Sequence, residues 1–422
     1  MKILALILFV LMYVLMITLP KHRPLYALGA AVIYLITGVL PIGRLPEAIN
    51  WNVLMMIAGT MIIVDYFIES KMPNRMADIL LEKSRNVMWV TIYMSLFSGV
   101  ISAFIDNVAT VLMVAPVGMA VCRKLKINPV GMILSIAVSS NLQGAATLVG
   151  DTTSIMLGDY AGMNFMNFFW MKGRPGIFFA VELGALATVP VMMFLFRKDK
   201  APVEAKEKTP VEDRMPTVML LVMVAALIVA SFIPNTPALI NGIICCSLAV
   251  VTMVLDLLRK GKAGGAVRAV KNLDGETLLL LLGLFVVIGG ITEVGLVDDF
   301  AGFIARSGGG SLFWLYTLVV WGSVVISAFV DNIPYVATML PVLAAVTRSL
   351  GIEPYLLYFG LLTGATLGGN ITPIGASANI AATGLLKKEG YESSFGDFMR
   401  IGVPYTLTAV IMGYLYLWIV WA

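Results

Sequence analysis

Long apolar stretches, separated by short polar and basic segments, follow one another along the whole chain. A helix needs about 20 mainly apolar residues to cross a bilayer, and many of these stretches come close to that length. Because backbone groups in lipid must be satisfied within their own segment, the pattern predicts an all-α protein that crosses a membrane many times. We expect helices over residues 3–19, 25–40, 49–68, 88–105, 107–121, 131–156, 176–196, 217–233, 238–257, 276–294, 312–330, 332–346, 355–386 and 401–421.

The pattern contains an internal repeat at a spacing of 225 residues. Ser102-Ala-Phe-Ile-Asp-Asn-Val-Ala-Thr110 returns as Ser327-Ala-Phe-Val-Asp-Asn-Ile-Pro-Tyr335. Residues 98–155 align with 323–380 without a gap and share 22 identities in 58 positions. Each copy places an acid and an amide inside an apolar segment, and intramembrane acids are costly in lipid and usually functional.

Two kinds of interrupted helix are predicted in each half. The pairs 88–105/107–121 and 312–330/332–346 read as re-entrant hairpins with an Asp-Asn at the tip, and Pro334 suits a turn better than a helix interior. The Gly-rich and Pro-rich clusters in 131–156 and 355–386 indicate discontinuous helices, which often mark a transporter's binding site. The amphipathic segments 72–84 and 297–306 are expected on the membrane surface, as arms to the hairpins.

Loop charges predict the topology. With five crossings and one hairpin in each half, an odd number of crossings separates the repeats, so the repeats are inverted. With both termini outside, the cytoplasmic segments hold 23 of the 29 Lys and Arg residues, as the positive-inside rule requires. We therefore expect a multi-pass inner-membrane protein with a first repeat at 1–196, a cytoplasmic linker at 197–216 and a second repeat at 217–422.

The amino-acid composition indicates a membrane protein and argues against several classes of function. The 422 residues are 59% hydrophobic and 13% charged, with a mean hydropathy of +0.92, and a soluble protein would be about a quarter charged. The net charge of +4 does not indicate a nucleic-acid partner, because the basic residues lie in loops. Three cysteines and one histidine, His22, provide neither a disulfide framework nor a visible nucleophile–base set, so no enzyme is predicted. No nucleotide-binding Gly-Lys-Ser/Thr loop is present, so ATP drive would need a separate ATPase subunit as partner.

Asp106 and Asp331 are the strongest candidates for chemistry. Carboxylate, amide and carbonyl oxygens suit hard cations, so a sodium site at Asp106, Asn107, Asp331 and Asn332 is one interpretation. A buried carboxylate can also exchange a proton for an ion. The alternative is structural, because Asp is a good N-cap and the second helix of a hairpin needs one. Two copies in register beside broken helices favour a binding site.

Neutral polar residues at the breaks complete the candidate site. Asp151 is the one charged residue among them. It aligns with Ala376 in the second repeat, so the two half-sites differ chemically. The alternative for the neutral residues is helix packing by small polar side chains. The remaining candidates for substrate or ion binding are Thr110, Thr147, Asp151, Thr152, Ser154, Asn370, Thr372, Ser377 and Asn379.

These motifs resemble the ion transporter superfamily, in the branch of arsenite/antimonite permeases, NhaD-type sodium–proton antiporters and the melanosomal P protein, with a citrate-transporter-like domain. The resemblance covers nearly the whole chain. It implies a scaffold domain and a mobile transport domain that moves in an elevator-like step, and frequently a homodimer. The family often has Gly-Asp-Pro-Pro-Asn where this chain has Gly150-Asp-Thr-Thr-Ser154, and that departure leaves the ligands of the first half open.

The function expected is secondary active transport of a small inorganic ion or oxyacid, of the arsenite/antimonite or sodium/proton antiport type. A proton or sodium gradient would drive it, with no other cofactor. The alternatives are a sodium- or proton-coupled carboxylate or anion symporter, and a passive ion channel. An Asp at the tip, where related dicarboxylate carriers have Ser, argues against a dianionic cargo, and a channel would not need inverted broken helices.

Overall fold

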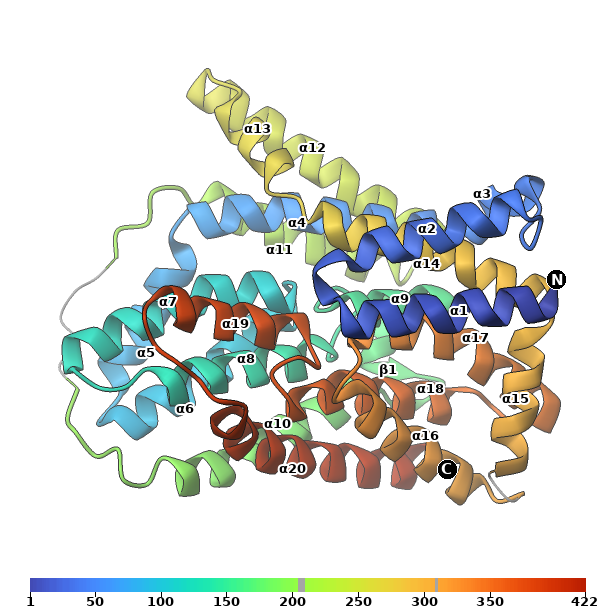
Figure 1. Cartoon of the computed structure of the whole chain (residues 1–422). Coiled ribbons are helices and arrows are strands. Elements are labelled where there is room, and N and C mark those ends of the chain that lie inside the picture. The colour runs from blue at the N-terminus through green and yellow to red at the C-terminus, as the bar shows by residue number, and fades with distance from the viewer. Residues whose placement is uncertain (204–208, 308–309) are drawn as a thin grey trace.

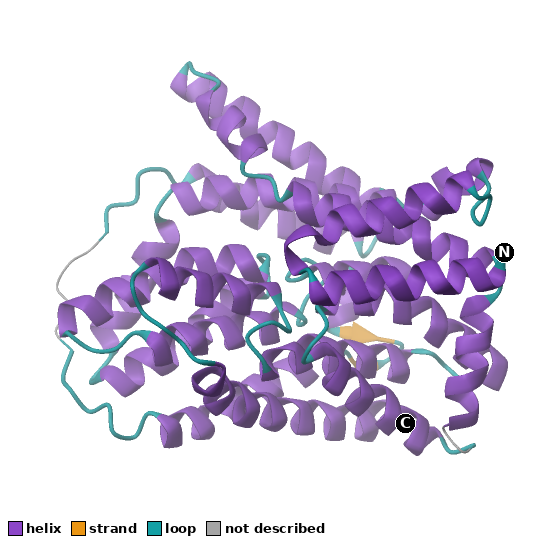
Figure 2. Ribbon diagram, in the orientation of Figure 1, coloured by secondary structure: helices purple, strands orange, loops and turns teal. Residues whose placement is uncertain are grey.

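The computed structural model describes residues 1–203, 209–307 and 310–422, and these are almost entirely helical (Figure 2). The predicted all-α class and most predicted helices are confirmed. The elements of the first half are α1 (Lys2–Thr18), η1 (Pro20–His22), α2 (Arg23–Ile36), η2 (Ile42–Arg44), α3 (Leu45–Ala48), α4 (Trp51–Glu69), α5 (Met72–Lys83), α6 (Val87–Ser102), α7 (Asn107–Leu125), α8 (Val130–Gly144), α9 (Thr152–Tyr160), η3 (Phe165–Phe168), β1 (Trp170–Met171), β2 (Arg174–Pro175) and α10 (Ile177–Leu195).

The second half repeats this order from α1 to α10, with differences in its short elements. They are α11 (Met215–Ala230), α12 (Ile240–Lys260), α13 (Gly264–Lys271), α14 (Gly275–Glu293), α15 (Leu296–Ser307), α16 (Leu312–Ser327), α17 (Asn332–Leu350), α18 (Tyr355–Leu362), the π-helical turn η4 (Thr363–Leu367), η5 (Gly369–Ile371), α19 (Ser377–Lys388) and α20 (Phe395–Trp421). Both hairpins and both interrupted helices lie where the sequence predicts them.

Some boundaries and short elements differ from expectation. Helix α20 begins at Phe395 rather than near 401, because Ser394 and Asp397 form a capping box that starts the helix in a polar turn. Helices α7 and α17 are longer than predicted, and each is followed by a residue with left-handed backbone, Lys126 and Gly351 respectively. The short helix α13 and the β1–β2 ribbon, paired antiparallel, were not predicted.

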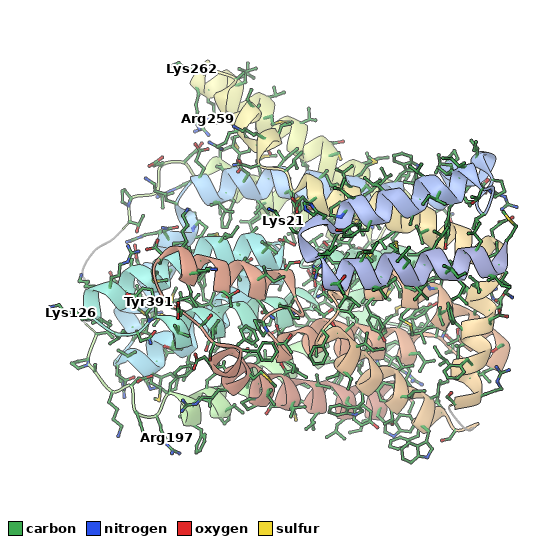
Figure 3. All side chains as sticks on the ribbon, viewed as in Figure 1. Lys21, Lys126, Arg197, Arg259, Lys262 and Tyr391 are labelled. Carbon is green, nitrogen blue, oxygen red and sulfur yellow. The ribbon has the colours of Figure 1, made fainter. Side chains whose placement is uncertain are left out.

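By length and composition, seven helices in the described part of the chain could each cross a membrane: α4, α7, α10, α12, α14, α17 and α20. The apolar helices α1, α2, α6, α8 and α11 are shorter. Four basic residues from segments predicted to be cytoplasmic, Lys126, Arg197, Arg259 and Lys262, lie toward the left of Figure 3.

The helices form two bundles, each drawn from both halves (Figure 1). We call α1, α2, α4, α11, α12 and α14 the outer bundle, in which α4 packs on α12 and α2 on α14. We call α6–α10 and α16–α20 the hairpin bundle, in which α8 packs against α6, α7, α19 and α20. Helix α5 packs on α7 and helix α15 on α17, so each arm lies against its own hairpin.

The equivalent helices α10 and α20 run in opposite directions. They pack along each other, and Trp421 at the end of α20 donates its Nε1–H to the carbonyl of Pro175, just before α10 begins (3.0 Å). Arg174 similarly donates to the carbonyl of Val420 (3.0 Å). Equivalent helices that pack antiparallel require repeats of opposite orientation.

Candidate functional site

Both hairpin tips are built in the same way. Asp106 caps α7 by accepting hydrogen bonds from the amides of Val108 (3.0 Å) and Ala109 (3.1 Å). Asp331 caps α17 by accepting from the amide of Ile333 (3.1 Å). The proposed capping role is therefore present in both copies, and it fixes each carboxylate at a helix N-terminus.

Each broken helix is tied to the hairpin of its own half by equivalent contacts. Thr147 donates its hydroxyl to the carbonyl of Ala103, and Thr372 donates to that of Ala328. Gly150 and Gly375 let the backbones approach closely, since a Cβ on either would lie 2.6 Å from the carbonyl oxygen of Ser102 or Ser327. These two threonines hold each tip against the break of its own half.

Side-chain amides join the two tips at the centre of the molecule. The Nδ2 groups of Asn107 (2.8 Å) and Asn332 (3.4 Å) both point to Oδ1 of Asn141 on α8. Asn141 donates in turn to Oδ1 of Asn370 (3.0 Å), whose own Nδ2 donates to the carbonyl of Val138 (3.1 Å). All four amides are buried, so they form a rigid bridge between the repeats.

A cavity of about 490 Å³ opens beside the first tip. It lies between α4, the N-terminal half of α7, the start of α9 and the segment before α14. Carboxylates dominate its polar lining, and no Lys or Arg is among its described lining residues. The polar lining residues are Thr60, Asp65, Asp106, Asp151, Thr152, Asn272 and Asp274.

The cavity carboxylates are not equivalent. Asp65 accepts from Arg268 (3.0 Å) and Asn272 (2.8 Å), and Asp274 caps α14 at Thr277. Asp151 is 2% exposed and accepts the hydroxyl of Thr153 (3.0 Å). Neither Asp106 nor Asp151 has a salt bridge to a described Lys or Arg, so negative charge is concentrated where the tip meets the break.

The second tip has its own cation. Asp331, also 2% exposed, accepts Nη1 of Arg23 at 2.7 Å and the hydroxyl of Ser377 at 3.0 Å, both on Oδ2. Asp331 does not line the cavity that contains Asp106. Asn107 and Asn332 therefore come together, whereas Asp106 and Asp331 face different surroundings.

The other predicted residues are bonded to backbone. Thr110 donates to the carbonyl of Ile105 (3.4 Å), and Ser154 donates to that of Gly144 (3.3 Å) across the first break. Asn379 donates to the carbonyls of Gly369 (3.0 Å) and Thr372 (3.2 Å) across the second break. Thr152 is the neutral candidate that lines the cavity. In the described part of the chain, no three His, Cys, Asp or Glu side chains are grouped for a metal ion.

Two residues of the site, Asn141 and Arg23, are not among those that the sequence predicts. Asn141 aligns with Thr366 in the repeat rather than with another Asn, so the repeat gave no signal for it. Arg23 was counted among the loop charges, because it directly follows Lys21 and His22. A polar residue that precedes a break by one helical turn could have drawn attention to Asn141, but only the fold brings Arg23 to residue 331.

A second cavity, of about 610 Å³, lies between α4, α9, α14 and α17. Asp159 at the end of α9 accepts from Nδ2 of Asn50 and of Asn52, each at 2.5 Å. Asn52 also accepts from the amide of Gly242 on α12 (2.8 Å). This cluster is a polar link between the outer bundle and the hairpin bundle.

Relatives of the chain are transporters. The chain is 30% identical to the "uncharacterized transporter Rv2684" of Mycobacterium tuberculosis, over 99% of this chain and 98% of that protein. It is 26% identical to the mouse P protein over 96% of this chain and 58% of that longer protein.

Solved structures share the fold at low sequence identity. The YdaH transporter of Alcanivorax borkumensis superposes with a TM-score of 0.62 at 16% identity, covering 92% of this chain and 88% of that one. MtrF of Neisseria gonorrhoeae, described with a class of antimetabolite efflux pumps, superposes with a TM-score of 0.61 at 16% identity, covering 93% and 84%. The citrate transporter family model matches residues 13–357 and 247–422, so this chain belongs to the citrate transporter family of membrane transporters.

Proposed function

We propose that this protein is a secondary active transporter of the inner membrane, which moves a small inorganic ion or oxyacid and couples that movement to a proton or sodium gradient. The observation that carries the proposal is the 490 Å³ cavity, in which Asp106 and Asp151 lie without a paired Lys or Arg among the described residues. Uncompensated carboxylates in a low-dielectric site require a cation or a proton, and that requirement is what a coupling ion satisfies.

The surroundings of Asp151 offer further oxygen ligands. A Cβ built on Gly144 would lie 3.1 Å from Cβ of Asp151 and 3.5 Å from Oγ of Ser102, so these two side chains lie on the same side of the break. Oγ of Ser102 is buried and has no hydrogen-bond partner among the described residues. We assign the coupling ion to Asp106 and Asp151, with Ser102 and Thr152 as neutral ligands. Both sodium and a proton suit this set.

Transport requires that the site face both sides of the membrane in turn. We propose that the hairpin bundle moves as a body against the outer bundle, in an elevator-like step. The proposal is supported by packing that is denser within each bundle than between them, and by a boundary crossed by separable polar links, such as Asp159 with Asn50 and Asn52. On this view the 490 and 610 Å³ cavities are entrances from opposite sides.

Flux in proteoliposomes tests the proposal. The purified full-length chain is reconstituted, a sodium or proton gradient is imposed, and uptake of arsenite, citrate and sodium is measured in turn. We expect gradient-driven flux of one cargo, with Asp106→Asn and Asp151→Asn each lowering it at least tenfold. Asp298→Asn on the exposed face of α15 is the matched control. Gradient-driven flux that survives in both site variants would remove the assignment.

The second candidate is symport of a carboxylate or other anion, and one observation favours it. Arg23 and Ser377 both lie at Oδ2 of Asp331, and a guanidinium beside a hydroxyl also suits a carboxylate ligand. The description of the family as citrate transporters agrees with this candidate. Citrate uptake that depends on sodium or protons would favour it, whereas rates far above those of carriers would favour a passive channel.

A further inference from the structure

The two hairpin tips have similar backbones, but only one of their two aspartates is paired with a basic side chain among the described residues. Asp331 has an internal guanidinium at 2.7 Å, while Asp106 has none among the described residues. The difference is written in the sequence: α2 begins at Arg23, whereas no Lys or Arg occurs between Arg214 and Arg259 around the equivalent start of α12. The carboxylate of the second tip is therefore neutralised within the protein, whereas that of the first tip needs a bound cation or proton.

Arg23 belongs to the other bundle from the residue that it neutralises. It lies at the first position of α2, which packs on α14, and its Nε also reaches the carbonyl of Met16 at the end of α1 (3.4 Å). Asp331 belongs to the hairpin bundle. The ion pair is largely shielded from water, with side-chain exposures of 15% and 2%. It therefore spans the boundary at which the proposed movement takes place.

A second contact crosses the same boundary at the same place. Tyr13 on α1 donates its hydroxyl to the carbonyl of Pro334 (2.6 Å) and lies 2.6 Å from the hydroxyl of Thr338. Helices α1 and α2 are thus bound to the N-terminal part of α17 by the ion pair of Arg23 and by the hydrogen bonds of Tyr13. If the hairpin bundle moves away from α1 and α2, the ion pair between Asp331 and Arg23 is broken.

We propose that Arg23 is a tethered cation that takes the place of a mobile coupling cation at Asp331 in the conformation described here. This inference rests on the proposed function. When the hairpin bundle moves away from α2, a mobile cation must replace the guanidinium, because a bare buried carboxylate is strongly unfavourable. Arg23 is then a positioning residue that makes movement of the second tip depend on a cation, and it prevents the unloaded carrier from slipping.

The sharpest test removes both charges together. In Arg23→Gln/Asp331→Asn, the second tip is neutral in either conformation without a cation, so movement no longer requires one there. In proteoliposomes driven by the gradient that works for the unmodified chain, we expect the double variant to accumulate cargo to a lower ratio, because one fewer coupling ion moves with each cargo. Arg23→Lys keeps the tethered charge and should accumulate cargo normally.

Each result has a defined meaning. A double variant that accumulates cargo as well as the unmodified chain overturns the inference. So does a folded double variant that moves as many coupling ions per cargo as the unmodified chain. If Arg23→Gln/Asp331→Asn does not fold, Arg23→Gln alone decides: it should change the number of coupling ions per cargo, and an unchanged ratio overturns the inference. Absence of gradient-driven flux in the unmodified chain would instead refute the proposed function itself.

Discussion

Asn141 donates its Nδ2–H to the carbonyl of Thr366 at 2.7 Å, and these two residues occupy the same position in the two repeats. Contact between equivalent positions occurs only where a pseudo-two-fold axis passes. The axis therefore runs through the ends of α8 and η4, between the two tips. The amides of Asn107, Asn332 and Asn370 converge on the same point.

Replacing Asn141 with Ala should loosen this centre. The change leaves several buried amides and a carbonyl without partners, and each such group costs about 1–3 kcal/mol. We expect Asn141→Ala to lower the free energy of unfolding by at least about 2 kcal/mol and to reduce flux. Thermal unfolding in detergent measures the first effect. A variant as stable as the unmodified chain would show that the amide bridge contributes nothing net.

Asp106 combines a cap with a charge, and two substitutions separate these roles. Asn is as good an N-cap as Asp, so Asp106→Asn should leave stability within about 0.5 kcal/mol while abolishing coupled flux. Asp106→Ala also loses the bonds to Val108 and Ala109, which costs about 1 kcal/mol more. Equal flux in the Asn variant and the unmodified chain would reduce Asp106 to a structural cap.

Gly150 and Gly375 should tolerate no side chain. An added Cβ would meet backbone oxygens of the break and the hairpin at 2.5–2.9 Å, and neither backbone can move independently. We expect Gly150→Ala and Gly375→Ala each to cost more than about 3 kcal/mol, seen as loss of monodisperse protein. Gly384 in α19 has nothing within 4 Å, so Gly384→Ala is the control and should gain up to about 1 kcal/mol.

Asp159 should hold the two bundles together on the side of the larger cavity. Its two bonds of 2.5 Å to Asn50 and Asn52 are charge-assisted, and Asp159→Ala removes both. With the native cysteines replaced, maleimide labelling of Ala337→Cys in that cavity should become severalfold faster. Glu47→Ala, on the same lining but in an exposed pair with Arg44, should leave the labelling rate unchanged.

The repeat made much of this architecture predictable. Its register places Asp106 on Asp331 and Gly150 on Gly375. Both aspartates cap the second helix of a hairpin, and both glycines meet equivalent carbonyl oxygens. Hydrophobic stretches located the long helices because a membrane span leaves a simple pattern. The polar start of α20 was missed, since its first turn is amphipathic and carries Asp397 and Arg400.

Side-chain partners across the fold were not predictable from the repeat. Thr147 and Thr372 are predicted ligand residues, and nothing in the sequence indicated that their hydroxyls also donate to the hairpin carbonyls of Ala103 and Ala328. The pairing of Arg23 with Asp331 spans 308 residues and has no counterpart in the other half, so no internal comparison could reveal it. Sequence symmetry predicts what the halves share and is silent about where they differ.

The crossed packing of α2 on α14 and of α4 on α12 has an evolutionary consequence. In each pair a helix of one half packs against a helix of the other half. The backbones are so close that a Cβ added to Gly59 or Gly283 would contact the backbone of Cys245 or Ala27. Neither half buries these surfaces by itself, as expected of repeats that derive from an antiparallel pair of identical chains related by a two-fold axis. In a pair of identical chains both aspartates would have the same partners, so an arginine beside Asp331 alone requires two halves whose sequences differ.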